Sequence, residues 1–216
     1  MPFRNRGSPR LHERCFLAFD RPKLGTTLVF PLTHARAPAL LVGKSTSRLQ
    51  MNIREALFDE HSKRQTMAIV NFIGGDPVKF GELMSIFFED EYRLTQRAAG
   101  PMSCSVERWP ELVYPYLEQL IDQLTRDDVH NAIKRNIVRL LQFIEIPDKL
   151  LGRVYSNCID LIDDVREPVA IRAFAVSVAE RIARTEPDLR NELRLIVKKH
   201  LAHSSAAFRS RAKSIL

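Results

Sequence analysis

Four arginines recur at a nearly constant spacing in the chain after residue 90. They stand 38, 37 and 39 residues apart, at Arg97, Arg135, Arg172 and Arg211. A guanidinium presents its N–H donors in one plane, so it can bind a carboxylate or a phosphate through two parallel hydrogen bonds. Arg209 and Lys213 add two cations beside the last of these arginines. These six side chains are the candidate partner-binding residues of the sequence.

Catalytic and metal-binding patterns are missing from the sequence. His200 and His203 have the spacing of a ligand pair on a helix, but no third ligand accompanies them, so we predict no metal. The motifs HExxH, GxSxG, GxGxxG and the P-loop are absent, as is the Ser-Ser-x-Met-Pro-x-Lys-x-Asn signature of adenylosuccinate lyase. Cys104 and Cys158 fall on or beside apolar stripes and are expected to be buried. We therefore predict no catalytic residues and no cofactor, and we favour a protein that is not an enzyme.

The elements that position the arginines are predicted to be helices. Apolar residues recur with a helical period in residues 117–124 (LEQLIDQL) and 135–146 (RNIVRLLQFIEI). Prolines mark the first turns of four helices, where the missing N–H would be unpaired anyway, and they are Pro77, Pro110, Pro147 and Pro187. Alternating strand patterns are absent after residue 50. The fold class is therefore predicted to be all-α.

The prolines also indicate a repeat. Their separations of 33, 37 and 40 residues lie in the range of helix-pair repeats. A second helix begins midway through each unit, and each second helix carries one of the four arginines. Over residues 76–216 the chain resembles the HEAT-repeat family of α-solenoids, because IRAFAVSV (residues 171–178) has an aliphatic-Arg pair followed by Ala at helical spacing. The segments YRLTQRAA and FRSRA resemble a narrower group of small bacterial HEAT-like, armadillo-type proteins.

The resemblance implies a right-handed α-α superhelix of about five helix pairs, in which residues 51–75 form a less regular capping pair. The chain departs from the family pattern at Gly100-Pro101. Pro101 has no N–H to donate to the carbonyl of Arg97, and its ring crowds that carbonyl. We therefore expect the second helix of this unit to kink or to end near residue 100.

A structural role for the arginines also follows from the resemblance. In HEAT arrays, an acidic residue in the turn bonds to an arginine in the second helix of a neighbouring repeat. Acidic residues precede three of the arginines, and the carboxylates of this ion-pair ladder would be Asp90, Asp128, Asp163 and Asp164. Arg135 and Arg172 should then be the most enclosed and pair with the last three carboxylates, whereas Arg211 should be the freest to bind a ligand. Both roles stay open, since an arginine row on the concave face can also hold a carboxylate or a phosphate.

Residues 1–50 differ from the rest of the chain. They hold nine of the 33 Lys/Arg and two of the 26 Asp/Glu, so they carry the whole net charge of +7, and the 24 basic and 24 acidic residues of 51–216 cancel. They contain five prolines and no sustained period. We expect a disordered basic tail or an over-extended gene start that places the true start at Met51; an organelle transit peptide is the remaining interpretation. Residues 51–216 are expected to be the solenoid domain.

Two functions suit such a chain. The first is a non-catalytic scaffold that binds a protein partner on the concave face of the solenoid. The second is nucleic-acid binding, as in the HEAT-like DNA-alkylation-repair glycosylases, because residues 190–216 carry seven Lys/Arg against one Glu. Residues 51–91, however, carry eight acids against four bases, whereas a phosphate-binding groove needs cations along most of its length. We favour the scaffold.

The cellular setting is inferred from composition. Three cysteines without a CxxC pair suit a reducing compartment, so we expect a cytoplasmic protein. No apolar run approaches the ~20 residues of a membrane span, so no membrane partner is expected. The sequence leaves the oligomeric state open.

Overall fold

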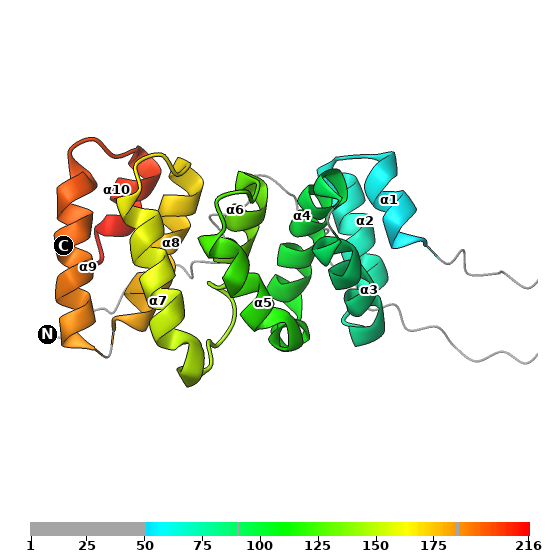
Figure 1. Ribbon diagram of the computed structural model, residues 1–216, viewed down its shortest axis with the longest axis horizontal. Helices are drawn as coiled ribbons and strands as arrows, with labels where there is room; N and C mark the ends of the chain where they lie inside the picture. The colour runs from blue at the N-terminus through cyan, green and yellow to red at the C-terminus, as the bar shows by residue number, and fades with distance from the viewer. Residues whose placement is uncertain (1–50, 90, 185) are drawn as a thin grey trace, which may run out of the picture. The chain divides into compact units, whose positions relative to one another are not determined.

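The computed structural model describes residues 51–216 apart from residues 90 and 185 (Figure 1). Regular structure in this part of the chain is entirely helical, so the predicted all-α class is confirmed. The expectations for residues 1–50 lie outside the described residues.

Ten α-helices form five consecutive pairs. The first helices of the pairs are α1 (Ile53–Asp59), α3 (Pro77–Phe88), α5 (Leu117–Asp122), α7 (Asp148–Asp163) and α9 (Pro187–Leu201). The second helices are α2 (Lys63–Ile73), α4 (Tyr92–Arg108), α6 (Asn131–Leu140), α8 (Val169–Ile182) and α10 (Ala206–Ala212). Two 3-10 helices, η2 (Pro110–Tyr116) and η3 (Gln123–Thr125), flank α5. The number of pairs agrees with the five that the family resemblance implied.

The helix pairs stack in sequence order. Each even-numbered helix contacts the next even-numbered helix, from α2 through α10, and these helices form one layer. The odd-numbered helices lie in a second layer, where α1 contacts α3 and α7 contacts α9 (Figure 1). The arginines at the predicted spacing all lie on helices of the even-numbered layer, so the sequence repeat and the structural repeat coincide.

Local signals explain where several helices begin and end. Asp76 caps α3 by accepting a hydrogen bond from the Val78 N–H at 2.8 Å, and Pro77 occupies the first helical position. Ser62 caps α2 by accepting from the Gln65 N–H at 3.1 Å. Gly74 ends α2 with a φ of 56°, in the left-handed region that glycine adopts without a Cβ penalty. The helix boundaries therefore follow from short-range chemistry.

One apolar core runs through all five pairs. It extends from Ile53 of α1 to Ile215 at the end of the chain, and every even-numbered helix contributes to it. Phe80 and Phe87 of α3 and Phe208 of α10 are among its largest enclosed side chains. Because each pair buries its apolar face only against its neighbours, the stack is stabilised by interfaces between consecutive pairs.

The sequence predicted a kink or an end of the helix near residue 100, and of these the end is wrong. Helix α4 continues for 17 residues through Pro101 to Arg108. Ala98, Ala99 and Met102, on either side of Gly100-Pro101, are fully buried, and α4 contacts α2, α3 and α6. Packing on three neighbours therefore holds the helix across the hydrogen bond that proline cannot make.

Across residues 51–216, apart from residues 90 and 185, no helix is both long enough and apolar enough to cross a bilayer.

Candidate functional site

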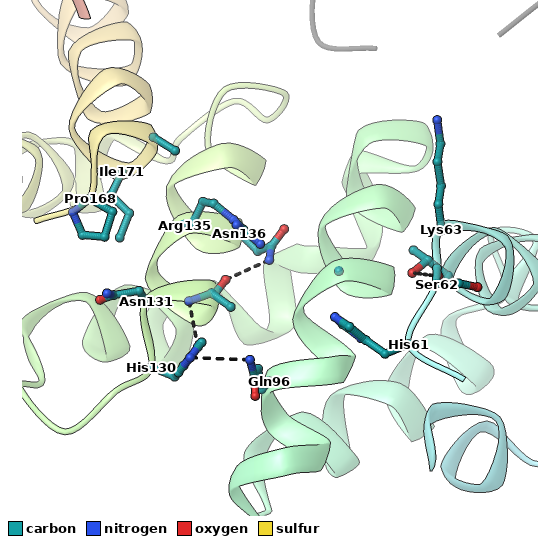
Figure 2. Close-up of a pocket in the computed structure, with 14 residues that line it drawn as sticks. His61, Ser62, Lys63, Gln96, His130, Asn131, Arg135, Asn136, Pro168 and Ile171 are labelled. Atoms are coloured by element: carbon teal, nitrogen blue, oxygen red, sulfur yellow. Dashed lines mark hydrogen bonds between the residues drawn. The ribbon is translucent and has the colours of Figure 1, made fainter. Parts of the chain in front are cut away.

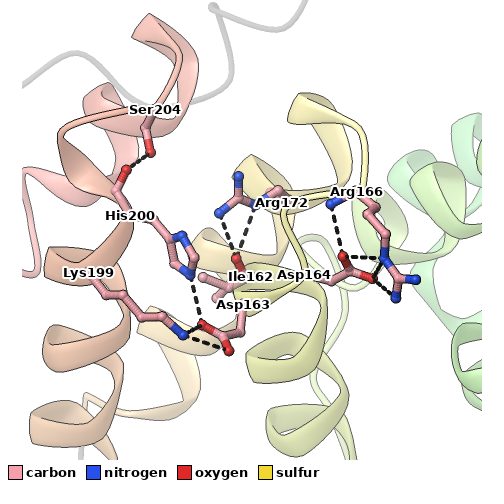
Figure 3. A network of polar contacts seen from close by, with 8 residues as sticks. All are labelled: Ile162, Asp163, Asp164, Arg166, Arg172, Lys199, His200 and Ser204. Atoms are coloured by element: carbon pink, nitrogen blue, oxygen red, sulfur yellow. Dashed lines mark hydrogen bonds and ion pairs between the residues drawn. The ribbon is translucent and has the colours of Figure 1, made fainter.

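Two of the spaced arginines cap the C-terminal ends of helices. Arg97 donates from Nη1 to the carbonyls of Leu57 and Phe58, both at 2.8 Å, in the last turn of α1. Arg172 donates to the Ile162 carbonyl in the last turn of α7, from Nε at 3.0 Å and from Nη2 at 2.8 Å (Figure 3). The last carbonyls of a helix lack a partner within the helix and form the negative end of its dipole. A guanidinium at this point satisfies both the hydrogen bond and the charge.

A third capping arginine was not singled out in the sequence. Arg181 of α8 donates to the carbonyls of Leu141 at 2.6 Å and Gln142 at 2.8 Å, just beyond the end of α6. Burial lowers the pKa of this guanidinium from its ordinary value. Arg181 lies outside the spaced row, and its partners are about 40 residues away in sequence, so no local pattern marks it.

The expected ion pairs of Arg135 and Arg172 with turn carboxylates are not formed. Asp128 pairs with Arg126, and Asp164 pairs with Arg166 at 2.9 Å, each within its own turn. These hydrogen bonds lower the pKa of both carboxylates. An arginine two residues away reaches the carboxylate with little ordering of the chain, so it displaces the more distant arginine. Asp90 lies outside the described residues.

Asp163 joins two consecutive helix pairs, but through other cations than expected. Its carboxylate contacts Lys199 Nζ at 2.8 Å and His200 Nε2 at 2.7 Å, so it connects α7 to α9 (Figure 3). The hydrogen bonds from Lys199 and His200 lower the pKa of Asp163. His200 is thus engaged with a carboxylate, and the part of the chain that the structure describes contains no cluster of three or more metal-ligating side chains.

The C-terminal cations are less free than expected. Arg211 donates from Nε to Ser177 Oγ at 3.0 Å, and its guanidinium lies 5.2 Å from the centroid of the Phe174 ring. Arg209 donates to the Ser204 carbonyl. The expectation that Arg211 is the freest of the four arginines is therefore wrong, because helix α8 of the preceding pair supplies both a hydroxyl and an aromatic face. Lys213 is exposed.

Two buried ion pairs between consecutive repeats were missed. Arg139 of α6 donates to Ser103 Oγ at 2.9 Å and pairs with Glu107, both on α4. Lys134 of α6 pairs with Glu167 at 3.0 Å, where the two side chains are only 10% and 11% exposed. Charged groups this enclosed require a partner. The inter-repeat ladder therefore exists, but it uses Arg139 and Lys134 and bypasses Arg135.

The cysteines are partly as predicted. Cys158 is buried, and burial raises the pKa of its thiol to about 12, which leaves it protonated and unreactive. Cys104 is only half-buried.

A groove of about 580 Å³ opens on the layer of even-numbered helices. Its walls are the first turn of α2, the middle of α4 and the first turns of α6 and α8, so it spans four helix pairs (Figure 2). We call it the inner-layer groove. It collects side chains from four helix pairs, including the charged groups of Lys63 and Arg135.

His130 shapes the middle of the inner-layer groove. It precedes α6, and its Nδ1 accepts a hydrogen bond from the Ala132 N–H at 3.0 Å, which caps the helix. Its Nε2 lies 3.5 Å from the amide nitrogen of Gln96 on α4 (Figure 2). Because Nδ1 acts as an acceptor, the neutral ring carries its proton on Nε2, and the amide oxygen of Gln96 is the group that suits this contact.

Arg135 is the one spaced arginine that lines the inner-layer groove. Its side chain is exposed, and among the described residues it has no hydrogen bond or ion pair. Lys63 adds a second cation at the α2 wall, and the lining contains no Asp or Glu. The structure therefore separates the arginine row: Arg97, Arg172 and Arg211 are engaged by the fold, and Arg135 faces the groove.

Comparison with known proteins agrees with the repeat architecture. The family described as the HEAT repeat domain matches residues 53–216, which is well over half of the chain. No curated protein and no solved structure matches the chain. The matched range covers all five helix pairs and includes the inner-layer groove. The chain therefore belongs to the HEAT-repeat family.

Proposed function

We propose that the protein is a non-catalytic scaffold that binds a protein partner on its concave face. We assign this face to the even-numbered helices, because they contact one another in an unbroken series. The observation that carries the proposal is the inner-layer groove, where one exposed arginine faces a hollow built from four helix pairs. HEAT-type arrays generally use such extended surfaces to bind other proteins.

Nucleic-acid binding is the weaker alternative. The groove lining contains one lysine and one arginine, Lys63 and Arg135. A bound nucleic acid needs a cation near most of its phosphates. Among the basic C-terminal residues that favoured this function, Arg209 and Arg211 both donate hydrogen bonds within the last repeats. A nucleic-acid strand would find too few free cations along the groove.

The location of the partner can be tested by photo-crosslinking inside the cell. A photoreactive amino acid is introduced in place of Asn131, an exposed residue of the groove wall, and separately in place of Glu82, an exposed residue of α3 in the other layer. We expect discrete protein adducts from the Asn131 position and not from Glu82. Adducts with nucleic acid at Asn131 would favour the alternative, and equal adducts at both positions would contradict a partner on the concave face.

The cellular location is part of the same proposal. The described cysteines, Cys104 and Cys158, are free thiols, which suits the reducing cytoplasm. Fractionation of the cells that carry the photoreactive variants would check it in the same experiment.

A further inference from the structure

We infer that the inner-layer groove takes an acidic segment of the partner protein, held through Arg135. This inference rests on the proposed function and names the chemistry of its ligand. It starts from the charge of the lining, which includes Arg135 and Lys63 but no carboxylate. The surface therefore favours a negatively charged occupant.

Arg135 is available for such a ligand because the carboxylates near it are paired with other cations. The neighbouring carboxylate Asp128 is paired with Arg126, and Glu167 is paired with Lys134. Neither carboxylate therefore needs Arg135 as its counter-ion, and Arg135 is exposed on the groove wall. A guanidinium in this position binds a carboxylate through two parallel hydrogen bonds.

The shape of the groove favours an extended segment over a single small anion. Its lining runs from His61 before α2 to Ile171 in α8, and most of the side chains between them are neutral (Figure 2). Asn131 offers an exposed amide group for a peptide backbone, and Pro168 adds an apolar end. The amides of Asn136 and Gln96 already contact Ala132 and His130. A partner with a carboxylate at Arg135 would therefore extend along polar and apolar walls on either side.

The chain's own N-terminal segment is a poor occupant on charge grounds. Residues 1–50 hold nine Lys/Arg against two Asp/Glu, so they have the same sign of charge as the groove. Like charges brought together oppose binding. The occupant we commit to is thus an acidic stretch of a different protein.

The test measures binding of labelled peptides to the full chain by fluorescence anisotropy. The probes are a Glu-rich peptide, a Gln-rich peptide of the same length and a single-stranded oligonucleotide. Arg135→Glu reverses the charge at this position and cancels the positive charge of the groove lining, and Arg190→Glu makes the same change of net charge at an exposed residue of α9 outside the groove. Arg135→Gln is a second, milder variant, and circular dichroism confirms that each variant is folded.

We expect the Glu-rich peptide to bind about tenfold more tightly than the Gln-rich peptide, and Arg135→Glu to weaken it about tenfold. Arg190→Glu should leave its affinity within about twofold, because exposed charges beyond a Debye length are largely screened. Equal binding of the two peptides, or equal losses in the Arg135→Glu and Arg190→Glu variants, would overturn the inference. Tighter, Arg135-dependent binding of the oligonucleotide would also overturn it.

The two proposals fail separately. If crosslinking at Asn131 captures a protein but the Glu-rich peptide does not bind, the scaffold function stands and the acidic ligand is wrong. If the peptide binds through Arg135 but crosslinking at Asn131 captures no protein, the charge preference of the groove stands and the scaffold function is wrong.

Discussion

At the scale of single residues, the arginines of this protein differ in the groups that their side chains contact. Arg97, Arg172 and Arg181 donate to carbonyls at helix ends, Arg139 pairs with a half-buried carboxylate, and Arg135 lines the inner-layer groove. A long side chain with several donors can serve any of these partners. The neighbours in space, and not the position in the repeat, determine which one it finds.

Removing Arg139 should destabilise the fold strongly. Its partner Glu107 is one quarter exposed, so Arg139→Ala would strand a largely enclosed carboxylate and leave Ser103 unpaired. We expect a loss of about 2 kcal/mol in the free energy of unfolding, below the full value for a buried pair because Glu107 keeps some water contact. Urea denaturation measures this change.

Arg153→Ala is the matched control for that loss. Arg153 pairs with Asp122 at the surface, where the side chains are 42% and 59% exposed. The expected change is below about 0.5 kcal/mol, as for other exposed pairs. Similar losses in the two variants would show that burial does not set the strength of these pairs.

The contribution of Asp163 should depend on pH. Hydrogen bonds from Lys199 and His200 lower its pKa in the folded state, so its stabilising effect is present above the unfolded pKa of about 3.9. This effect is lost as the pH falls through the lower, folded pKa. Asp163→Asn should therefore be less stable than the parent at pH 7, and the difference should shrink below about pH 4.

Urea titrations across this pH range measure the difference. Asp160→Asn serves as the control, because Asp160 is an exposed carboxylate of the same helix. A constant difference between Asp163→Asn and the parent at every pH would mean that the ionised carboxylate is not the stabilising form.

At the scale of elements, local capping explains helix ends and packing explains helix continuity. Asp76 and Ser62 begin helices through side-chain hydrogen bonds within three residues. Helix α4, in contrast, passes through Pro101 because its buried face contacts α2, α3 and α6. An isolated peptide of the same sequence would lack these contacts and would be expected to break at the proline.

Pro101→Ala should stabilise the protein modestly. A proline inside a helix costs about 3 kcal/mol relative to alanine, whereas losing two buried methylene groups of its ring costs about 1.6 kcal/mol. Pro101 is buried, so both effects apply, and we expect a net gain of about 1 kcal/mol in the free energy of unfolding. Thermal denaturation followed by circular dichroism measures it.

Pro77→Ala provides the comparison, since Pro77 occupies the first turn of α3 and its missing N–H would be unpaired there. No gain is expected from that change. A loss of stability in Pro101→Ala would indicate that the neighbouring helices are shaped around the proline ring.

At the scale of the whole molecule, one apolar core shared by five helix pairs stabilises the described part of the chain. The core begins at Ile53, directly after the basic segment of residues 1–50 ends. We expect deletion of residues 1–50 to leave the melting temperature unchanged within about 2 °C, a shift that corresponds to at most about 1 kcal/mol. Thermal denaturation of the full chain and of residues 51–216 makes the comparison.

Deletion of residues 1–75 is the comparison, because it also removes helices that belong to the core. Removing residues 1–75 also removes α1 and α2, which bury Ile69 and Ile73 against the core and contact α4. That variant should melt well below the full chain, because the next pair then exposes its apolar face. If the shorter deletion lowers the melting temperature by as much as the longer one, residues 1–50 belong to the folded unit.

The amino-acid sequence by itself determined the helices, their pairing and the repeat. Helical periodicity and first-turn prolines act over a few residues, so the helix start at Pro77 could be predicted without tertiary contacts. The resemblance to the HEAT-repeat family rested on the segment IRAFAVSV (residues 171–178) within this repeat. These features are local or periodic, and a linear sequence displays them directly.

Only the tertiary structure decided what the arginines do and where the groove lies. Arg139 finds Glu107 32 residues away, Arg181 finds Leu141 40 residues away, and the groove brings His61 and Ile171 to the same hollow. A guanidinium on a flexible stem reaches helix carbonyls, hydroxyls, rings or carboxylates with similar ease. The partner of each arginine depends on which group the packed helices place within hydrogen-bonding distance. The spacing of residues along the chain does not determine that distance.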